Sequence, residues 1–558
     1  MNYKEEYKRW LKFATADIDI LNELKHMSDV EVEDAFFCNL AFGTGGLRGV
    51  MGAGTNRINI YTVAKASQGL VNYLKKKYVF PSIIIGYDSR INSELFAKVA
   101  GGIFASNGVK VNIWPMLMPV PTVSFAIRYL GASAGVMLTA SHNSCKYNGY
   151  KVYGADGCQI TTEVASDILV EIEKLDIFKD INIGDFDACI ANNSIRYIPE
   201  EVYSAYIDAV KRQSVLFGEN VNKDFNIVYS PLNGTGFRPV IRVLKEMGYS
   251  NVVVVKEQEE PDGNFTTCPY PNPEIKDAMA LGIEYSKKYN ADLLLATDPD
   301  CDRVGVAVKS KTGEYEILSG NQIGVLLFDY ICSQRKKYEM MPAKPVMVKS
   351  IVTTDMGEQI AKHYGVCTIN VLTGFKFIGE QIGKMEIEER VDNYVFGFEE
   401  SYGYLTGSYV RDKDGVNGAY MICEMFSYYA TYGVNLLEKL DELYKIYGYY
   451  LNTLHSYEFD GRVGIMKIQS IMQKFRNGVK KLGEEKIVEM LDYALGLGGL
   501  PKSNMLKLML ENNSSVVVRP SGTEPKLKIY VSVNAENKEL AELVEKQIVS
   551  ALEVYIGE

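Results

Sequence analysis

The sequence predicts a multidomain α/β protein, and three observations support this fold class. The chain has 558 residues, which is more than usually fold around one hydrophobic core, so three or four domains are expected. Apolar segments rich in β-branched residues alternate with segments of helical spacing, which is typical of parallel α/β layers. The C-terminal part has a different pattern and predicts a small α+β module.

The predicted strands are short apolar runs, many of them followed by turn-forming residues. Between the first two, residues 94–108 have the spacing of a helix. Residues 257–274 are rich in proline, asparagine and acidic side chains and predict a long ordered loop. The strands are expected at residues 82–88, 109–114, 134–138, 225–230, 251–255, 291–297, 346–352, 367–372 and 393–398.

The C-terminal module is predicted from two apolar segments and one helix. The segments "SSVVVRPSG" (514–522) and "PKLKIYVSV" (525–533) predict a pair of strands. A helix should follow, because apolar residues recur every four positions and form one face. These residues are Leu540, Val544, Ile548 and Leu552.

Composition and charge limit the class of protein. Hydrophobic residues make up 47% and charged residues 23% of the chain, as in soluble globular proteins. No apolar stretch of about 18 residues predicts a transmembrane helix, and the N-terminus lacks the apolar core of a signal peptide. Nine scattered cysteines favour a reducing cytoplasm over a disulfide framework. A net charge of −10 argues against a nucleic-acid surface, but it leaves room for a local basic pocket that binds a small phosphorylated molecule.

Three aspartates alternate in the loop "ATDPDCDR" (296–303), between two apolar segments. Asp298, Asp300 and Asp302 would repel one another, and a bound cation would compensate. An EF-hand is excluded, because its required glycine and glutamate are both missing at the matching positions. Oxygen ligands beside Arg303 favour Mg²⁺ next to a phosphate. A solvated acidic turn is the alternative.

A second polar loop, "TASHNSCKYNGYK" (139–151), follows the apolar segment "AGVML". Ser141 lies beside His142, with Lys151 close behind. One interpretation is a nucleophile at the mouth of a site. The alternatives are an ordinary polar loop or a helix N-cap, where serine is favoured.

Glycine-rich segments suggest phosphate binding to different degrees. The segment "FGTGGLRG" (42–49) fits neither a P-loop nor a dinucleotide fingerprint and is weak evidence. "GASAG" (131–135) matches a hydrolase pattern, but a strand follows it, so Ser133 is expected in a loop. The segment 516–530 is stronger, because a guanidinium, two hydroxyls and free backbone N–H groups suit a phosphate dianion. A capped turn between strands is its alternative.

Together, four loops in this order resemble those of the α-D-phosphohexomutase family, most closely its bacterial phosphoglucomutase branch. The segment "TASHN" resembles the phosphoserine loop, "DPDCDR" the metal loop, "GFEES" (397–401) the sugar loop and "RPSGTEPKLKIY" the phosphate loop. The resemblance covers nearly the whole chain, and "PDGNF" (261–265) and "TGFK" (373–376) add to it. The family usually has proline after "SHN", where this chain has Ser144 and Cys145.

The resemblance implies a fold of four domains around a central cleft. Three would be related mixed α/β domains, and the fourth a smaller C-terminal α+β domain. The expected ranges are 1–205 with the phosphoserine loop, 206–325 with the metal loop, 326–450 with the sugar loop and 451–558 with the phosphate loop.

The resemblance also implies roles for single residues. Ser141 is expected to carry the phosphoryl group and, with the three aspartates of the metal loop, to bind one Mg²⁺ per chain. Lys151 would act as general base or acid, assisted by His142 and Arg48, while Arg303 would steady the transferring phosphate.

Sugar and phosphate contacts are expected from the remaining loops. Glu399 and Ser401 would accept from and donate to sugar hydroxyls in two orientations. Lys376 would add a sugar contact, and Lys349 is a weaker candidate. The phosphate that does not react would be held by Arg519, Ser521, Gly522, Thr523 and Lys526.

The implied activity interconverts glucose 1-phosphate and glucose 6-phosphate through a phosphoserine enzyme. Glucose 1,6-bisphosphate would be both intermediate and activator. Alternatives within the class are phosphopentomutase, phosphomannomutase and glucose 1,6-bisphosphate synthase. Outside it, a phosphatase or a non-catalytic sugar-phosphate binder remains. We expect small sugar phosphates as partners, no nucleic acid, no membrane, and a monomer or weak homo-oligomer.

Overall fold

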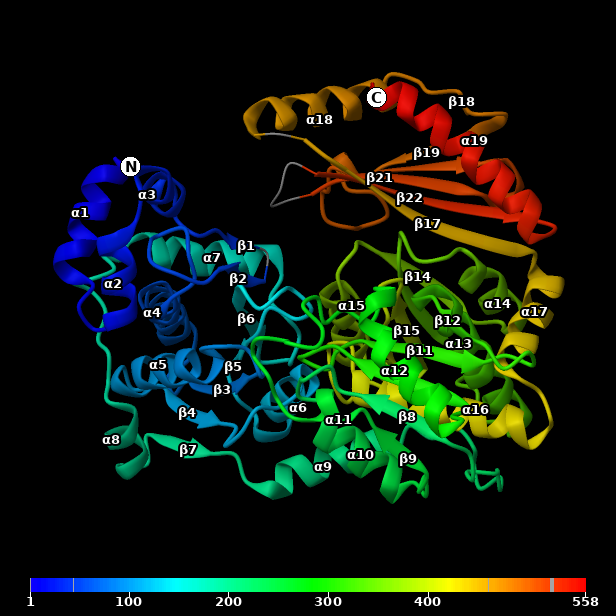
Figure 1. Ribbon diagram of the computed structural model, residues 1–558, viewed down its shortest axis with the longest axis horizontal. Helices are drawn as coiled ribbons and strands as arrows, with labels where there is room; N and C mark the ends of the chain where they lie inside the picture. Colours follow the sequence, from blue (N-terminus) through cyan, green and yellow to red (C-terminus); the bar gives the residue numbers. More distant parts are fainter. Residues whose placement is uncertain (1, 44, 460, 522–525, 558) are drawn as a thin grey trace. The chain divides into compact units, whose positions relative to one another are not determined.

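Figure 1 shows the computed structural model, which describes residues 2–43, 45–459, 461–521 and 526–557. The chain divides into two compact units, each built from several segments. The first unit consists of Met1–Ser319, Phe375–Tyr394 and Tyr402–Tyr428. The second consists of Gly320–Gly374, Val395–Ser401 and Tyr429–Glu558. None of the described helices combines the length and hydrophobicity needed to cross a membrane.

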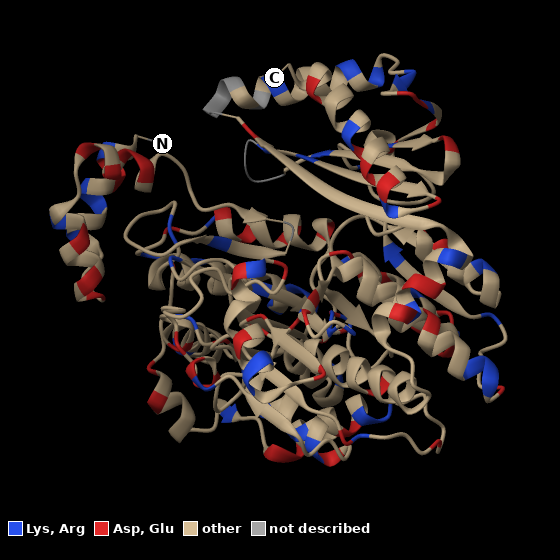
Figure 2. Ribbon diagram, turned by 45° about the vertical axis from the view of Figure 1, so that its right-hand side comes forward, with Lys and Arg blue, Asp and Glu red and all other residues tan. Residues whose placement is uncertain are grey.

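The first unit begins with three short helices that pack around the buried Trp10. Asp17 caps the second of them, and Ser28 with Glu31 forms a capping box at the third. Acidic and basic residues are interspersed along these helices (Figure 2). The helices are α1 (Tyr3–Phe13), α2 (Ile18–His26) and α3 (Asp29–Phe36).

A seven-stranded mixed sheet follows, in the order β1-β2-β6-β5-β3-β4-β7. Its strands are β1 (Phe42–Gly43), β2 (Gly46–Val50), β3 (Ser82–Tyr87), β4 (Lys110–Ile113), β5 (Ala134–Leu138), β6 (Tyr147–Gly154) and β7 (Ile195–Tyr197). The predicted strands at 82–88, 109–114 and 134–138 pair in parallel. Strands β2 and β6 extend the sheet with antiparallel pairing.

Helices around this sheet bury its central strands, so these strands are continuous apolar runs. Asn59 caps α4 at its first turn, and three lysines in its last turn suit the helix dipole. The helix expected at 94–108 is α5, which spans Ser93–Ser106. The helices of this part are α4 (Ile60–Lys77), α5, α6 (Val120–Leu130), α7 (Thr162–Glu173), α8 (Phe186–Ala191) and α9 (Glu200–Lys211).

A second sheet has the order β12-β11-β10-β8-β9. Its strands are β8 (Ile227–Ser230), β9 (Val252–Val254), β10 (Leu293–Thr297), β11 (Val304–Lys309) and β12 (Tyr315–Leu318). Strands β10 and β11 are antiparallel, with Thr297 opposite Val304. The helices are α10 (Phe237–Glu246), α11 (Lys256–Glu259) and α12 (Lys276–Tyr289). The loop predicted at 257–274 therefore begins inside the short α11.

Four further elements belong wholly or mostly to the first unit. They are α15 (Phe375–Ile387), the 3-10 helix Val391–Asn393, β16 (Gly403–Leu405) and α16 (Gly415–Thr431). The second unit starts with α13 (Gly320–Lys337), β13 (Val346–Ser350), α14 (Met356–Tyr364) and β14 (Cys367–Val371). It continues with most of β15 (Tyr394–Glu399) and with α17 (Leu436–Tyr447). Strands β13 and β14 pair in parallel, as the alternation of strands and helices predicts.

The C-terminal sheet is antiparallel and has the order β17-β22-β21-β20-β19-β18. Its strands are β17 (Tyr449–Glu458), β18 (Lys481–Leu482), β19 (Glu485–Asp492), β20 (Leu506–Leu510), β21 (Ser515–Pro520) and β22 (Lys526–Ala535). The predicted pair is β21 with β22. Helices α18 (Gly461–Arg476) and α19 (Lys538–Ile556) accompany it, with 3-10 turns at Tyr493–Leu495 and Glu511–Asn513.

The predicted apolar face of the last helix needs one correction. Ile548 and Leu552 are buried in the core of this sheet, and Val544 packs against it. Leu540, however, is 40% exposed, and Ala541 occupies the core position in the first turn. A strict repeat of four drifts around a helix of 3.6 residues per turn, so its first member leaves the face.

Candidate active site

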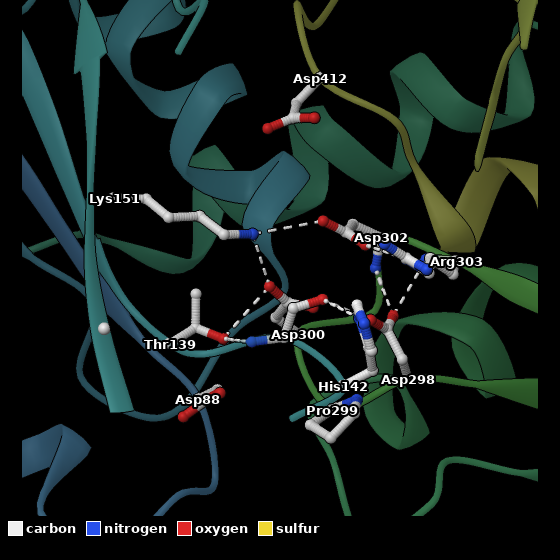
Figure 3. A network of polar contacts seen from close by, with 12 residues as sticks. Asp88, Thr139, His142, Lys151, Asp298, Pro299, Asp300, Asp302, Arg303 and Asp412 are labelled. Atoms are coloured by element: carbon white, nitrogen blue, oxygen red, sulfur yellow. Dashed lines mark hydrogen bonds and ion pairs between the residues drawn. The ribbon is translucent and has the colours of Figure 1, made fainter. Parts of the chain in front are cut away.

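The three aspartates lie in the turn between β10 and β11. All three are fully buried, and one carboxylate oxygen from each lies within 4.8 Å of the others. Figure 3 shows the carboxylates converging from this short loop, with Lys151 reaching toward two of them. The three aspartates could therefore hold a metal ion.

The fold of this loop depends on its first aspartate. Asp298 Oδ1 accepts hydrogen bonds from the main-chain N–H groups of Asp302, at 3.1 Å, and Arg303, at 3.0 Å. A glycine is required at position 234, because a Cβ atom there would lie 2.4 Å from the Cα atom of Pro299. These contacts turn the remaining aspartates inward.

The electrostatics of the loop favour a bound cation. Burial and the charges of Asp302 and Asp300 raise the pKa of Asp298 well above its usual value. Burial would also raise the pKa of Asp302, but Lys413, Lys151 and Arg303 lower it below its usual range. Buried Oδ1 atoms of Asp300 and Asp302 have no hydrogen-bond partner among the described residues. Two buried carboxylate oxygens without hydrogen bonds fit ligands of a divalent cation.

Ser141 lies directly beside this cluster. Its Oγ donates to Asp298 Oδ2 at 2.9 Å and lies 3.1 Å from His142 Nδ1. The serine has a φ of +53°, a left-handed conformation that is uncommon for a residue with a side chain. Its N–H donates to Thr139 Oγ1 at 2.8 Å. Ser141 is therefore in a tight turn after β5, and it is not a helix N-cap.

Two lysines neutralise the aspartates. Lys151 Nζ, on β6, lies 2.8 Å from Asp300 Oδ2 and 3.3 Å from Asp302 Oδ2. Burial would lower the pKa of Lys151, but these two carboxylates raise it. Lys413 Nζ lies 2.7 Å from the same Asp302 oxygen. Sequence reasoning missed Lys413, whose signal was the charge-rich segment "RDKDG" (411–415) before α16.

His142, Arg48 and Arg303, the other residues expected near the serine, differ in their contacts. Burial lowers the pKa of His142 well below its usual value, and the charges of Arg303 and Arg48 lower it further. Arg48 Nη1 donates to Asn143 Oδ1 at 3.2 Å. The guanidinium of Arg303 is paired with Glu274, which the sequence did not indicate.

The residues expected to contact the sugar have fewer described contacts with one another than the residues around Ser141. Lys376 is largely buried, and this burial lowers its pKa to about 8. In the second unit, Glu399 Oε1 accepts from the N–H of Gly374 at 2.7 Å, so "GFEES" contacts "TGFK" there. Ser401 is partly exposed at the end of that loop. Lys349, the weaker candidate, is fully buried and pairs with Asp355.

The phosphate-loop candidates lie at the β21–β22 turn of the second unit. Arg519 is half-buried on β21, and the N–H of Ser521 donates to the carbonyl of Lys526 at 2.7 Å. Lys526 Nζ also pairs with Glu458 at 3.0 Å. Gly522 and Thr523 lie outside the described residues.

The structure thus brings together six of the expected residues by direct contacts in the first unit: Ser141, His142, Lys151, Asp298, Asp300 and Asp302. Arg303 contacts them through its main-chain N–H, which donates to Asp298, and through its Nε, which lies 3.9 Å from Asp302 Oδ1. Arg48 contacts Asn143, the residue after His142. Ser133, the rejected hydrolase candidate, lies in the loop before β5 and accepts a hydrogen bond from Ser82 N–H. Arg90, which sequence reasoning also missed, donates to the carbonyl of Ser141.

Four family models match successive parts of the chain. They are described as phosphoglucomutase/phosphomannomutase alpha/beta/alpha domain I, at residues 39–177, domain II, at 204–313, and domain III, at 319–447. The C-terminal domain of the same family matches residues 460–549. These matches confirm the predicted class of fold, with three α/β domains and a C-terminal domain. The boundaries near residues 205, 325 and 450 stay predictions.

Relatives of known name match over nearly their whole length. A phosphoglucomutase of Staphylococcus haemolyticus is 36% identical over 519 residues, covering 91% of this chain and 92% of the relative. One from Staphylococcus aureus is 34% identical over 543 residues, covering 95% of each chain.

Solved structures show the same fold at low sequence identity. The open form of Paramecium parafusin, a phosphoglucomutase, has a TM-score of 0.73 at 17% identity, covering 93% of this chain and 96% of that one. A putative phosphomannomutase from Thermus thermophilus has a TM-score of 0.69 at 21% identity, covering 92% and 99%. With the family models and the staphylococcal relatives, the resemblance carried by the four loops is confirmed: the chain belongs to the α-D-phosphohexomutase family and is similar to its bacterial phosphoglucomutases.

Proposed function

We propose that the chain interconverts glucose 1-phosphate and glucose 6-phosphate, with Ser141 as the phosphoryl carrier. The observation that carries this proposal is the contact of Ser141 Oγ with Asp298, 2.9 Å away, inside a buried triad of carboxylates. A hydroxyl in that position can exchange a phosphoryl group where metal and lysine charges converge. The staphylococcal relatives, named phosphoglucomutases, support glucose as the sugar.

One Mg²⁺ per chain would be held by Asp298, Asp300, Asp302 and an oxygen on Ser141. The ion, when bound, would withdraw negative charge from the transferring phosphoryl group. The oxygen-only donor set and the two carboxylate oxygens without hydrogen bonds fit this ion.

The chain's own residues would position the phosphoryl group and move a proton. Lys151 is the proposed general base or acid, because its amine lies at the carboxylates that face Ser141. His142 lies beside the serine oxygen, and its lowered pKa keeps it neutral as a hydrogen-bonding partner. Arg48 and Arg303 would bind phosphate oxygens. Arg303 would then leave its ion pair with Glu274 and bind the substrate phosphate instead.

The proposed cycle contains two phosphoryl transfers. In the first, the O–P bond of phospho-Ser141 breaks and a bond forms to the free hydroxyl of the hexose monophosphate. The resulting glucose 1,6-bisphosphate turns over, and Ser141 attacks its other phosphate. In each transfer one proton moves from the attacking hydroxyl to the oxygen that leaves. Added glucose 1,6-bisphosphate would act as activator by rephosphorylating the serine.

The second unit would supply recognition of the substrate. Glu399 and Ser401 are proposed to bind sugar hydroxyls in both orientations, with Lys376 of the first unit as a further contact. The distal phosphate is proposed to bind Arg519, Ser521, Gly522, Thr523 and Lys526.

The test is the phosphorylation of Ser141 during turnover. Intact-mass analysis of active protein should show a phosphorylated fraction that maps to the peptide with Ser141. Glucose 6-phosphate should discharge it, and glucose 1,6-bisphosphate should restore it. Ser141→Ala should fold normally and lose mutase activity by several orders of magnitude. Ser144→Ala, in the same loop, is the matched control and should keep the activity.

The same assay separates the alternatives. A phosphatase would release inorganic phosphate, a binding protein would show no phosphoserine turnover, and a bisphosphate synthase would accumulate glucose 1,6-bisphosphate. Mannose and pentose 1-phosphates, tested in parallel, would identify phosphomannomutase or phosphopentomutase activity. Wild-type activity in Ser141→Ala contradicts the proposal.

We also propose a cytoplasmic location and a monomer or weak homo-oligomer. The location is supported by all nine cysteines being free thiols, as expected in a reducing compartment. Sedimentation of the purified protein at several concentrations would test the oligomeric state.

A further inference from the structure

We propose that Arg90 is a positioning residue that holds the nucleophile loop, residues 139–147, in the conformation that directs Ser141 at the carboxylates. This inference rests on the proposed function, because it assigns to Arg90 an effect on phosphoryl transfer. Among the contacts described for it, Arg90 touches neither the three aspartates of the metal loop nor the side chain of His142, and it acts through the main chain of the nucleophile loop.

Arg90 binds the loop with both terminal nitrogens of its guanidinium. Its Nη1 donates to the carbonyls of Ser144, at 2.9 Å, and Tyr147, at 3.0 Å. Its Nη2 donates to the carbonyls of Ser141 and Asn143. One planar group therefore binds four carbonyl groups within seven residues, a geometry that the rigid fork of arginine provides and the point charge of lysine does not.

Arg90 is itself held on its other sides. It is 3% exposed, and its Nε lies 3.3 Å from Asp88 Oδ2. The other oxygen of Asp88 accepts from the N–H of Arg90 at 3.0 Å and from Ser93 Oγ at 2.7 Å. The guanidinium also lies 5.0 Å from the ring centroid of Phe265, within the range of a cation–π contact.

Phe265 belongs to "PDGNF" (261–265), which sequence analysis singled out without a role. This segment packs closely on the chain around Arg90, because a Cβ atom on Gly263 would lie 2.6 Å from the nitrogen of Ile91. The Asp262 carboxylate orders the segment by accepting from the N–H groups of Asn264 and Thr266, each at 2.9 Å. We therefore assign to this segment the support of Arg90, through the ring of Phe265 and the close packing of Gly263.

The nucleophile loop needs such support because its conformation is unfavourable by itself. Ser141 has a φ of +53°, which a residue with a side chain adopts only when its surroundings impose it. Residues 139–147 contain neither proline nor glycine, so hydrogen bonds must fix the main chain. Without Arg90, we expect the turn to relax and Ser141 Oγ to leave its position 2.9 Å from Asp298.

The expected signature is a loss in kcat without a matching change in KM. Misplacing a reacting atom by about 1 Å can cost roughly 100-fold in rate. None of the contacts described for Arg90 involves a residue proposed to bind sugar or the distal phosphate, so ground-state binding should persist. A residue that only stabilised the fold would lower the amount of active protein and leave kcat per folded molecule unchanged.

The experiment compares Arg90→Lys and Arg90→Met with Arg57→Lys. Arg57 is a matched control, since it also donates to two main-chain carbonyls, those of Asp34 and Asn56, and pairs with Asp34. For each variant, kcat and KM for glucose 1-phosphate are measured per folded molecule, together with Tm and the rate at which glucose 1,6-bisphosphate phosphorylates Ser141. We expect kcat and the phosphorylation rate to fall about tenfold in Arg90→Lys and about 100-fold in Arg90→Met, with KM within about threefold. Arg57→Lys should keep both rates.

Rescue by a small molecule gives a second readout. In Arg90→Ala, free guanidinium at millimolar concentration should restore at least part of kcat, and methylammonium should restore less. If Arg90→Met fails to fold, Arg90→Lys and the rescue decide. The proposal is overturned if Arg90→Lys and Arg90→Met keep wild-type kcat, if only KM changes, or if Arg57→Lys shows the same loss. An inactive, unphosphorylated wild type would instead contradict the proposed function.

Discussion

Two buried clusters of aspartate and lysine, one in each compact unit, contain the same kinds of side chain but differ in their hydrogen bonding. In the first unit, three aspartates face Lys151 and Lys413. In the second, a single aspartate, Asp355, faces Lys349 and Lys507. The contrast shows how a site can be distinguished from a structural ion pair.

The second cluster satisfies its carboxylate completely. Lys507 Nζ lies 2.8 Å from Asp355 Oδ1 and 3.1 Å from Oδ2, and Ser515 Oγ donates to Oδ2 at 2.8 Å. Lys349 Nζ adds a contact of 3.2 Å. Burial would raise the pKa of Asp355, but the two lysines lower it to about 2.

The first cluster leaves carboxylate oxygens of Asp300 and Asp302 without hydrogen bonds in the part of the chain that the structure describes. It also raises the pKa of Asp298, because burial and two neighbouring carboxylates disfavour its charged form. Natural proteins rarely leave buried polar atoms unpaired unless another group binds them. In a cluster of three converging carboxylates, incomplete hydrogen bonding therefore favours a ligand site, whereas the fully hydrogen-bonded Asp355 favours a structural role.

The largest expected effect is the loss of activity when a substitution disrupts the first cluster. Asp300→Asn should lower mutase activity by about 10³-fold, because it removes a charged ligand from the proposed metal site and a partner of Lys151. The fold should survive, since the amide has nearly the same size. Activity at saturating Mg²⁺ and circular dichroism measure the two properties. EDTA should abolish wild-type activity and Mg²⁺ should restore it; full activity of the variant in chelator would contradict the assignment.

Breaking the second cluster should affect stability instead. Asp355→Asn leaves the buried Lys507 without its carboxylate partner and leaves Lys349 with only the more exposed Glu358. Breaking a buried ion pair in this way typically costs about 3–5 kcal/mol. Denaturant unfolding measures this loss, and activity per folded molecule should change far less than in Asp300→Asn. Glu358→Gln is the control, because Glu358 is a more exposed partner of Lys349. Equal stability of Asp355→Asn and wild type would contradict a structural role for Asp355.

The same aspartate should give the protein a pH-dependent stability. Its pKa is about 2 in the folded chain, below the ordinary value of 3.8. A lowered carboxylate pKa stabilises the folded state above about pH 4, and this contribution of about 2 kcal/mol is lost as pH falls through 2. The free energy of unfolding, measured from pH 6 to pH 2 in wild type and Asp355→Asn, should show a smaller slope in the variant. Parallel curves for the two proteins would show that Asp355 does not contribute to the pH dependence of stability.

The smallest expected effect concerns a cation proposed to bind substrate. Arg519→Ala should raise KM by about tenfold, which corresponds to the lower end of the free energy that a charge-assisted hydrogen bond contributes. Phosphorylation of Ser141 by the bisphosphate should persist, because Arg519 is proposed to hold the phosphate that does not react. Steady-state kinetics and intact mass measure both effects. A KM equal to that of wild type would exclude Arg519 from the site.

Much of the fold could be predicted because its signals are local. Strand β5 was expected at 134–138 and spans Ala134–Leu138, since a run of buried apolar residues needs no distant partner to be recognised. The metal loop was equally local, with three aspartates in five residues after β10. The parallel pairing of β3, β4 and β5 followed from the alternation of strands and helices.

What the sequence alone determined is therefore the order of elements and the loops that carry reactive groups. Only the tertiary structure decided which distant side chains meet them, because such contacts depend on packing. Lys413 lies 111 residues from Asp302, to which it is paired, and Arg90 lies 51 residues from Ser141. Lys349 resembled a substrate contact in sequence, but packing buried it against Asp355. Burial and partner choice decide whether a charged residue serves a site or the fold, and both are properties of the folded chain.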